Sequence, residues 1–438
     1  MKKVVSLLII VFMSVGLFSC MPNLQKFVIE FAAPKVEITE EVEQDAKFDA
    51  FLDKINEFSI SVSASILSSA GANDNLCISP ASIYMSLAVA SECASGLTRQ
   101  EILDAVGVSY DEMKEYTKYY YALFNKEYTY VDTYGAEHVS AHEQLATSLW
   151  IDSDQRYYKS CVDTLSKDYN CDVYSISFKN GTAKKLINQY IPYKMHNIVD
   201  GDADISSSAD LSIISLYHLK EIWNEFGRKL TLSLENYSFV NADKSSVEKQ
   251  LLKSGYASGR VYISLQYTAF CIETEHGYRL YFMIPNNSYT LNEVFTPKNI
   301  FKMFNRREYG FVDDVNEQLH YTRLLFPQMN VSFSGDISNN LKNDFNINSL
   351  FSEENCDLSG LLWTPAHCNS FIHKAKLSLD AKGIEGETID LGQADVKDDD
   401  LPNYERVYHE YVIDRAFGFV LTDADGLILY TGQLNTLK

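Results

Sequence analysis

The sequence predicts an α+β fold built on a large, mainly antiparallel β-sheet. Residues 48–70 and 79–97 carry apolar side chains at helical spacing, and strand-like segments dominate the rest of the chain. Early helices succeeded by a mixture rich in strands are typical of α+β proteins. With 438 residues, of which 46% are hydrophobic, the chain is long enough to bury a large core.

The N-terminus resembles the signal of a bacterial lipoprotein. Lys2 and Lys3 precede an apolar run that is short for a membrane span and that ends just before Cys20. We expect residues 1–19 to be removed and Cys20 to be lipidated, which would anchor an exported protein to a membrane, facing the periplasm or the cell exterior. An ordinary cleaved signal and an uncleaved membrane anchor are the alternatives. Residues 20–46 are acidic and lack a period, so we expect a tether there, followed by one domain over residues 47–438.

The second helical stretch, residues 79–97, has a clear start. Ser79 is a suitable N-cap and Pro80 suits the first helical position. The later residues of the stretch are nearly all apolar, so this helix is predicted to be buried on most sides.

Seven segments then have the composition of strands, which is rich in β-branched and aromatic residues. They are residues 144–152, 171–178, 210–218, 259–275, 278–285, 323–335 and 374–380.

A long polar segment separates the strand that ends at Asp380 from two more strands at the C-terminus. A connection of this length between well-made strands is usually functional or disordered. From Ile384 onward, small or apolar residues alternate with wetter ones, so the segment contains a latent strand whose small face could pack on a core. Asp390 is the one clear exception on that inward face.

Composition and motifs argue against several functions. The formal charge of −21 makes binding to a phosphate backbone unlikely, so nucleic acid is set aside as a partner. His138 and His142 are four residues apart beside Glu143 but form no HExxH motif, so an exposed face or loop is favoured over a zinc site. No nucleophile elbow, P-loop or dinucleotide fingerprint occurs. We therefore expect no cofactor, no metal and no enzymatic activity. Seven cysteines besides Cys20, an odd number, leave at least one thiol free.

The order of motifs resembles the serpin family. NLCISPASI and SLAVASECASGLTRQEI are followed, in collinear order, by LATSLWID, YNCDVYSISF, IISLYHLKEIWNEF, YFMIP, LLFPQMNV, LFSEENCDLSGL, FIHKAKLSLDAKG and AFGFVLTDADGLILYTGQL. The resemblance covers roughly residues 45–438. It implies three β-sheets, about eight to nine surrounding helices, and an exposed reactive-centre loop at about residues 381–412.

The resemblance also implies a function. Serpins offer this loop as bait to an endopeptidase of the serine class, or in some cases the cysteine class, and trap the acyl-enzyme as the cleaved loop inserts into the main sheet. Such insertion is a known example of strand addition. We therefore expect a monomeric suicide inhibitor whose partner is a target endopeptidase. The alternative is a non-inhibitory serpin that is a cleavable substrate or a ligand-binding module.

Several residues match positions of the family. The hinge of the loop corresponds to Lys382, Gly383, Ile384, Glu385, Gly386, Glu387, Thr388, Ile389 and Asp390. A polar cluster where the main sheet opens corresponds to Ser79, Ser82, Ser215 and His373, and Trp223 matches the tryptophan near the point where the loop inserts.

The hinge departs from the inhibitory pattern, since Ile384 replaces a threonine or serine and Asp390 faces inward. A buried carboxylate without a partner costs several kcal/mol. About a dozen new strand residues offset that cost by on the order of 10 kcal/mol, so insertion remains favourable but is predicted to be slower. The scissile bond is Lys397–Asp398 when counted from the hinge, and near Arg406–Val407 when counted back from the C-terminal strands. A taut tether to the protease favours Lys397.

Overall fold

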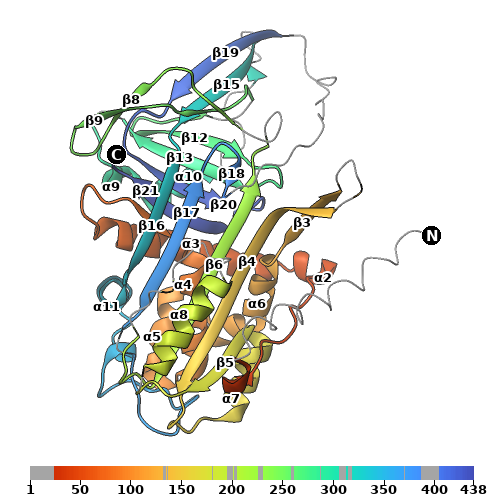
Figure 1. The fold of residues 1–438 in the computed structure, drawn as a ribbon, viewed down its shortest axis with the longest axis vertical. Coiled ribbons are helices and arrows are strands. Elements are labelled where there is room, and N and C mark those ends of the chain that lie inside the picture. Colours follow the sequence, from red (N-terminus) through yellow and green to blue (C-terminus); the bar gives the residue numbers. More distant parts are fainter. Residues whose placement is uncertain are drawn as a thin grey trace.

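The computed structural model of this chain has a long main sheet with helices on both faces and two smaller sheets packed at one end (Figure 1). It describes residues 24–131, 135, 137–179, 181–194, 201, 205–224, 230–257, 261–286, 288–304, 312–313, 318–368, 370–385 and 404–438. The predicted α+β class and the three sheets are confirmed, with one further two-stranded hairpin.

Ten α-helices lie within these described residues. They are α2 (Glu40–Glu43), α3 (Ala46–Ser68), α4 (Pro80–Cys93), α5 (Gly96–Val106), α6 (Tyr110–Leu123), α7 (Lys159–Asp168), α8 (Thr182–Lys194), α9 (Leu291–Val294), α10 (Pro297–Phe304) and α11 (Ser338–Phe345). The number exceeds the expected eight to nine because α2 and α9 are single turns. As predicted, α4 starts after Ser79 with Pro80 in its first turn, and every residue of this helix is buried.

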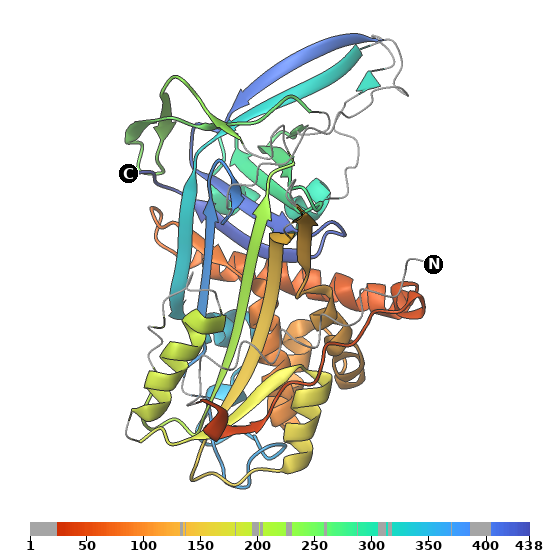
Figure 2. The ribbon, with the colours of Figure 1, turned by 45° about the vertical axis from the view of Figure 1, so that its right-hand side comes forward.

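The main sheet has eight strands in the order β1-β5-β4-β6-β18-β17-β16, with β3 paired to β4. Their bounds are β1 (Val28–Glu30), β3 (Glu127–Val131), β4 (Glu137–Asp152), β5 (Cys171–Ile176), β6 (Leu211–Ile222), β16 (Met329–Asp336), β17 (Ile372–Leu379) and β18 (Gly383–Ile384). Helix α8 crosses one face of this sheet, while α3 and α4 lie behind the other (Figures 1 and 2).

The two smaller sheets are built mostly from the second half of the chain. A five-stranded sheet contains β7 (Thr231–Leu232), β10 (Leu252–Lys253), β14 (Val312–Asp313), β15 (Gln318–Phe326) and β19 (Glu405–Val412). A six-stranded sheet contains β2 (Leu76–Ile78), β11 (Val261–Ile263), β12 (Tyr267–Glu273), β13 (Arg279–Pro285), β20 (Phe417–Thr422) and β21 (Ile428–Leu434). Strands β8 (Tyr237–Val240) and β9 (Ser246–Lys249) form the hairpin.

The expected tether over residues 20–46 is wrong for its described part. After a short 3-10 helix, η2 (Leu24–Phe27), strand β1 pairs with β5 at the edge of the main sheet. The next residues are also held, because Ala32 N–H donates to Asp172 and Ala33 N–H donates to the carbonyl of Ser166. Backbone hydrogen bonds therefore fix a segment whose apolar residues follow no sustained helical or strand period.

The core fills both sides of the main sheet. The larger cluster lies between this sheet, α3, α4 and the six-stranded sheet, and a smaller one packs α8 against β4 and β5 around Trp150 and Tyr174.

Within the part of the chain that the structure describes, no helix is long and apolar enough to cross a membrane. All seven cysteines other than Cys20 are free thiols.

Candidate functional site

The start of the predicted loop is inserted into the main sheet as strand β18. Gly383 pairs with Ile222 of β6, and Ile384 pairs with both Glu221 of β6 and Leu379 of β17. Both pairings are antiparallel, and Ile384 is fully buried. This two-residue strand separates β6 from β17 at one end of the sheet.

Below β18, strands β6 and β17 remain apart. Within their described residues no backbone pairing joins them directly, although each is fully paired on its other edge, to β4 and β16. A cavity of about 100 Å³ lies between them. It is lined by residues 211–216 of β6, by Ile372 and Lys374 of β17, and by residues of α4, α8 and the loops beneath. The main sheet therefore has an unfilled position between two strands, directly below the point where the loop begins.

A tight turn leads into β18. The carboxylate of Asp380 accepts hydrogen bonds from the backbone N–H groups of Lys382 and Gly383 at 2.7 and 3.2 Å. Trp223, fully buried, donates its indole N–H to the carbonyl of Asp380 at 2.8 Å. Trp223 therefore contacts the turn that precedes β18, and its predicted role at the point of loop entry stays a prediction.

Gly383 is required by its close approach to β6. A Cβ atom at this position would lie 1.9 Å from the carbonyl oxygen of Glu221, which is backbone and cannot move aside. Any side chain would therefore push β18 away from β6.

Glu385 bridges the two strands that border the gap. Its backbone N–H donates to the carbonyl of Ser378 in β17 at 3.0 Å. Its carboxylate lies 2.9 Å from Nε2 of His218 in β6, and only 9% of the Glu385 side chain is exposed. The residue has a positive φ of 49°, so the chain leaves the extended path here. In the alternation that starts at Ile384, Glu385 falls on the wetter face, but its side chain is enclosed.

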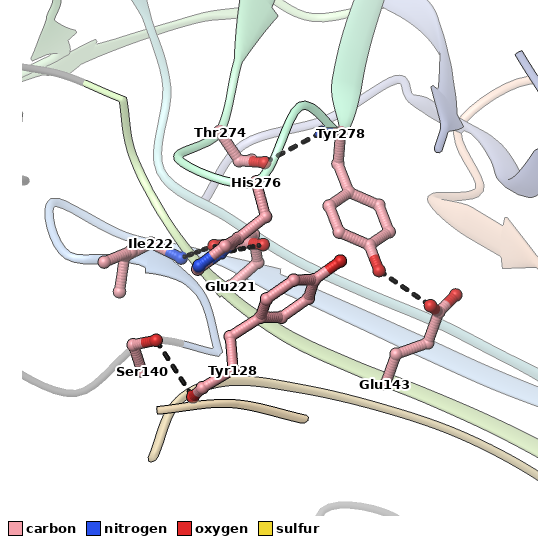
Figure 3. A network of polar contacts seen from close by, with 8 residues as sticks. All are labelled: Tyr128, Ser140, Glu143, Glu221, Ile222, Thr274, His276 and Tyr278. Atoms are coloured by element: carbon pink, nitrogen blue, oxygen red, sulfur yellow. Dashed lines mark hydrogen bonds and ion pairs between the residues drawn. The ribbon is translucent and has the colours of Figure 1, made fainter. Parts of the chain in front are cut away.

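A polar network surrounds this end of the sheet (Figure 3). The buried carboxylate of Glu221 lies 2.9 Å from Nδ1 of His276, whose ring stacks on Tyr128 at 3.8 Å between centroids. Burial raises the pKa of Glu221, and its contact with His276 opposes that effect. The network therefore links β6 to β3 and to the turn between β12 and β13.

Glu143 forms the second part of the network. Its carboxylate accepts hydrogen bonds from the hydroxyls of Tyr217 and Tyr278, both at 2.7 Å. Burial raises the pKa of Glu143 to about 7, so this group titrates near neutral pH. The sequence favoured an exposed face or loop here. Glu143 instead lies in β4 with 1% of its surface exposed.

The predicted polar cluster is assembled in part. Ser79 N–H donates to Nε2 of His373 at 3.2 Å, and the hydroxyl of Ser82 donates to the carbonyl of Ser79 at 3.0 Å. Ser215 lies on β6, across the gap, and its hydroxyl contacts Thr147 of β4 at 3.3 Å. Three of the four residues are thus linked directly, and the fourth faces them from the other strand.

The remaining predicted site residues lie either in the five-stranded sheet or outside the described part of the chain. Arg406 and Val407 lie in β19, paired in parallel with Leu319 and His320 of β15. Outside the described residues are Cys20, Gly386, Glu387, Thr388, Ile389, Asp390, Lys397 and Asp398.

Sequence reasoning missed His218, Glu221 and His276 altogether. Each is an isolated polar residue in or beside an apolar strand. The only signal in the sequence for a site here was a polar residue at a strand position that is otherwise expected to be buried.

The fold and the site define a class of protein whose main sheet keeps a place open beside the start of its own loop. The profile of the Serpin (serine protease inhibitor) family matches residues 53–437, and the chain belongs to this family. Serpins are in general protease inhibitors rather than enzymes, although some are non-inhibitory.

Similar proteins agree with this assignment. Serpin-ZX of Arabidopsis thaliana is 22% identical over 410 residues, covering 86% of this chain and 96% of its own. The native structure of the thermophilic serpin Tengpin aligns with a TM-score of 0.72 at 16% identity, covering 95% of this chain and 99% of that one. The structure of human thyroxine-binding globulin complexed with thyroxine aligns with a TM-score of 0.71 at 19% identity, covering 89% of this chain and 99% of that one. At these identities the two structural likenesses show the fold alone.

Proposed function

We propose that this protein is an inhibitory serpin that traps serine endopeptidases, with cysteine endopeptidases as a second class of target. The observation that carries the proposal is the unfilled position between β6 and β17, with Gly383 and Ile384 already paired at its upper end. A strand that fills this position gains hydrogen bonds on both edges, each contributing about 1 kcal/mol.

The reaction begins as ordinary proteolysis. The protease nucleophile attacks the carbonyl of Lys397, the bond to Asp398 breaks, and the leaving amine takes up the proton, which gives an acyl-enzyme. The freed loop then extends β18 along the gap and carries the attached protease with it. Trapping occurs when insertion is faster than deacylation.

The scissile bond proposed is Lys397–Asp398. Cleavage at Arg406–Val407 requires a protease to bind residues that are paired with β15 throughout β19, which makes that bond a poor substrate. The expected result is that Lys397→Ala abolishes cleavage by a trypsin-like protease, whereas Arg406→Ala does not. Mass spectrometry of the released C-terminal peptide identifies the bond directly.

A covalent complex tests inhibition. Equimolar protease and the full chain are expected to give a band on a denaturing gel at the sum of the two masses less that of the released C-terminal peptide. Thr388→Arg places a charge on the inward face of the inserted strand and is expected to convert the inhibitor into a substrate. Gln393→Arg, on the outward face, is the matched control. Stoichiometric cleavage without any covalent band for the native chain would reject the proposal.

A non-inhibitory serpin is the second candidate. The observation that favours it is the hinge itself, since Ile384 is buried and Glu385 is held at His218, and both contacts oppose rapid release of the loop. Thyroxine-binding globulin, whose structure was solved in complex with thyroxine, has the same fold. Cleavage that raises thermal stability without trapping a protease supports this candidate.

Export as a lipoprotein is part of the proposal. Relatives in this family are mostly secreted extracellular proteins. We propose that Cys20 carries a lipid that attaches a monomeric domain to a membrane. Metabolic labelling with a fatty acid is expected to mark the native chain but not Cys20→Ala.

A further inference from the structure

An exposed aromatic pair lies at the end of the main sheet opposite the hinge. The rings of Tyr158 and Trp363 are 5.7 Å apart between centroids, and 45% and 56% of these residues are exposed. Trp363 N–H donates to the carbonyl of Arg156 at 3.0 Å, and Tyr158 N–H donates to the carbonyl of Leu361 at 2.8 Å. Backbone hydrogen bonds between two segments therefore hold both rings at the surface.

A third exposed apolar side chain, Leu97, lies beside the same loop. It is 61% exposed at the start of α5. Ser95 N–H donates to the carbonyl of Asp357, and Asp357 N–H donates to the hydroxyl of Thr98. Leu97 is thus flanked by two contacts to the segment 357–363, which carries Trp363. We call Leu97, Tyr158 and Trp363 together the basal surface.

The first described residues of the chain lie at this end too. Leu24 packs in the smaller core cluster with Phe178, whose N–H donates to the carboxylate of Asp152 at 2.8 Å. The carbonyl of Asp152 accepts from the N–H of Gln155, the residue before Arg156. Figure 2 shows η2 and β1, in dark red, at the lower end of the molecule.

The short distance along the chain from Leu24 to Cys20 decides what this end faces. The two residues are four positions apart, so an extended chain spans at most roughly 14 Å between them. A lipid on Cys20 would hold that residue at a bilayer. Leu24, and with it this end of the molecule, then lies close to the headgroups.

We propose that the basal surface rests in the interfacial region of the bilayer that holds the lipid of Cys20. The inference rests on the proposed function, of which lipidation is a part. Tryptophan and tyrosine favour this region, because each combines an apolar ring with one polar group. The guanidinium of Arg156 lies 5.8 Å from the centroid of the Trp363 ring, where it is placed to bind a headgroup phosphate.

The charges around the basal surface favour apolar contact over attraction to anionic lipid. Lys159 is paired with Glu30 and Asp163, and Lys179 is paired with Asp154. The whole chain carries a formal charge of −21, which opposes binding to an anionic surface. We therefore expect the contact to form on a zwitterionic bilayer and to persist at high salt.

This orientation points the hinge away from the membrane. Gly383 pairs with Ile222 at one end of β6, and Leu211 at the other end lies opposite Ile151. Eleven strand residues separate the two ends of β6, a distance of about 35 Å. A lipid-anchored inhibitor held in this way presents its loop to proteases in the surrounding medium.

Tryptophan quenching tests the contact directly. Of the three tryptophans, Trp150 and Trp223 are fully buried and Trp363 is exposed. The lipidated full chain is reconstituted into phosphatidylcholine vesicles with or without bromine on the acyl chains, since bromine quenches a tryptophan that touches it. The brominated vesicles are expected to remove up to about a third of the emission, the share of one interfacial tryptophan in three. Unchanged emission overturns the proposal.

Two variants with a relocated tryptophan supply matched positions. Both carry Trp363→Phe, which removes the exposed tryptophan. Adding Tyr158→Trp is expected to restore the quenching. Adding Tyr408→Trp, at a position on β19 that is 54% exposed near the other end of the molecule, is expected not to restore it. Equal quenching in the two variants overturns the orientation.

Failure of the contact and failure of lipidation give different results. A chain that incorporates fatty acid and stays on the vesicles, but is not quenched, overturns the contact and leaves lipidation intact. A chain that incorporates no fatty acid and stays in solution overturns both. A blue shift of the Trp363 emission with rising protein concentration, without quenching, assigns the basal surface to a second copy of the chain and overturns the membrane contact.

Discussion

The carboxylate of Glu385 and Nε2 of His218 lie 2.9 Å apart, both largely buried, at the upper end of the gap between β6 and β17. The backbone of Glu385 is bound at the same time to Ser378 of β17. One residue therefore ties the start of the loop to both borders of the gap. The loop is held at two inserted residues, and further insertion has to release this contact.

Glu385→Ala is expected to loosen β18. Removing the carboxylate costs a charge-assisted hydrogen bond of about 2 kcal/mol, so amide exchange in residues 380–385 should accelerate by more than tenfold. Hydrogen exchange with mass spectrometry measures the effect. Glu410→Ala, which removes a half-exposed carboxylate 4.0 Å from Lys253, is the control and should leave these residues unchanged. Unaltered protection in Glu385→Ala would show that His218 does not anchor the hinge.

Gly383→Ala is expected to expel β18 from the sheet. The added methyl group would meet the Glu221 carbonyl at 1.9 Å, so the strand must separate from β6. Residues 382–385 should then become sensitive to limited proteolysis, and the chain should lose about 2–4 kcal/mol of stability. Gly181→Ala is a suitable control, because nothing lies within 4 Å of the added atom and only its positive φ is strained. If Gly383→Ala resists proteolysis as the native chain does, the close approach is not a constraint.

Glu143→Gln is expected to flatten the dependence of stability on pH. The folded-state pKa of about 7 lies above the ordinary value of about 4.3, so the native state holds a proton that the unfolded chain releases. The stabilisation is complete below about pH 4.3 and is lost as pH rises through 7, a change of about 4 kcal/mol. Urea unfolding between pH 5 and 8 measures it. If the free energy of unfolding of Glu143→Gln depends on pH as steeply as that of the native chain, a group other than Glu143 is responsible for the dependence.

Trp223 is expected to report loop insertion. Its indole N–H binds the carbonyl of Asp380, and its ring packs at 6.1 Å from Phe326, so extension of β18 changes its surroundings. Cleavage of the loop should shift the tryptophan emission of the native chain, and Trp223→Phe should remove most of that shift. Trp363→Phe, at an exposed position, should retain it. Equal shifts in both variants would mean that the hinge does not move near Trp223.

Much of the fold was predictable from local signals in the sequence. The helical spacing of residues 48–70 and the Ser79–Pro80 start correspond to α3 and α4, and the strand-like segments correspond to strands of the three sheets. The hinge at Lys382 and Gly383 was placed from motif order along the chain, which needs no knowledge of packing, and it stays a prediction. Such patterns are determined by side-chain periodicity and by the conformations that proline and glycine allow.

Only the tertiary structure decided how the site is held. His218 and Glu385 are 167 residues apart, and they meet because the register of β6 and β18 brings them together. The pairing of Val28–Glu30 with β5 was equally hidden, since a three-residue edge strand has no readable period. Burial of Glu143 depends on Tyr217 and Tyr278, which come from two other elements. Strand register and burial arise between distant segments, so the order of residues alone does not reveal them.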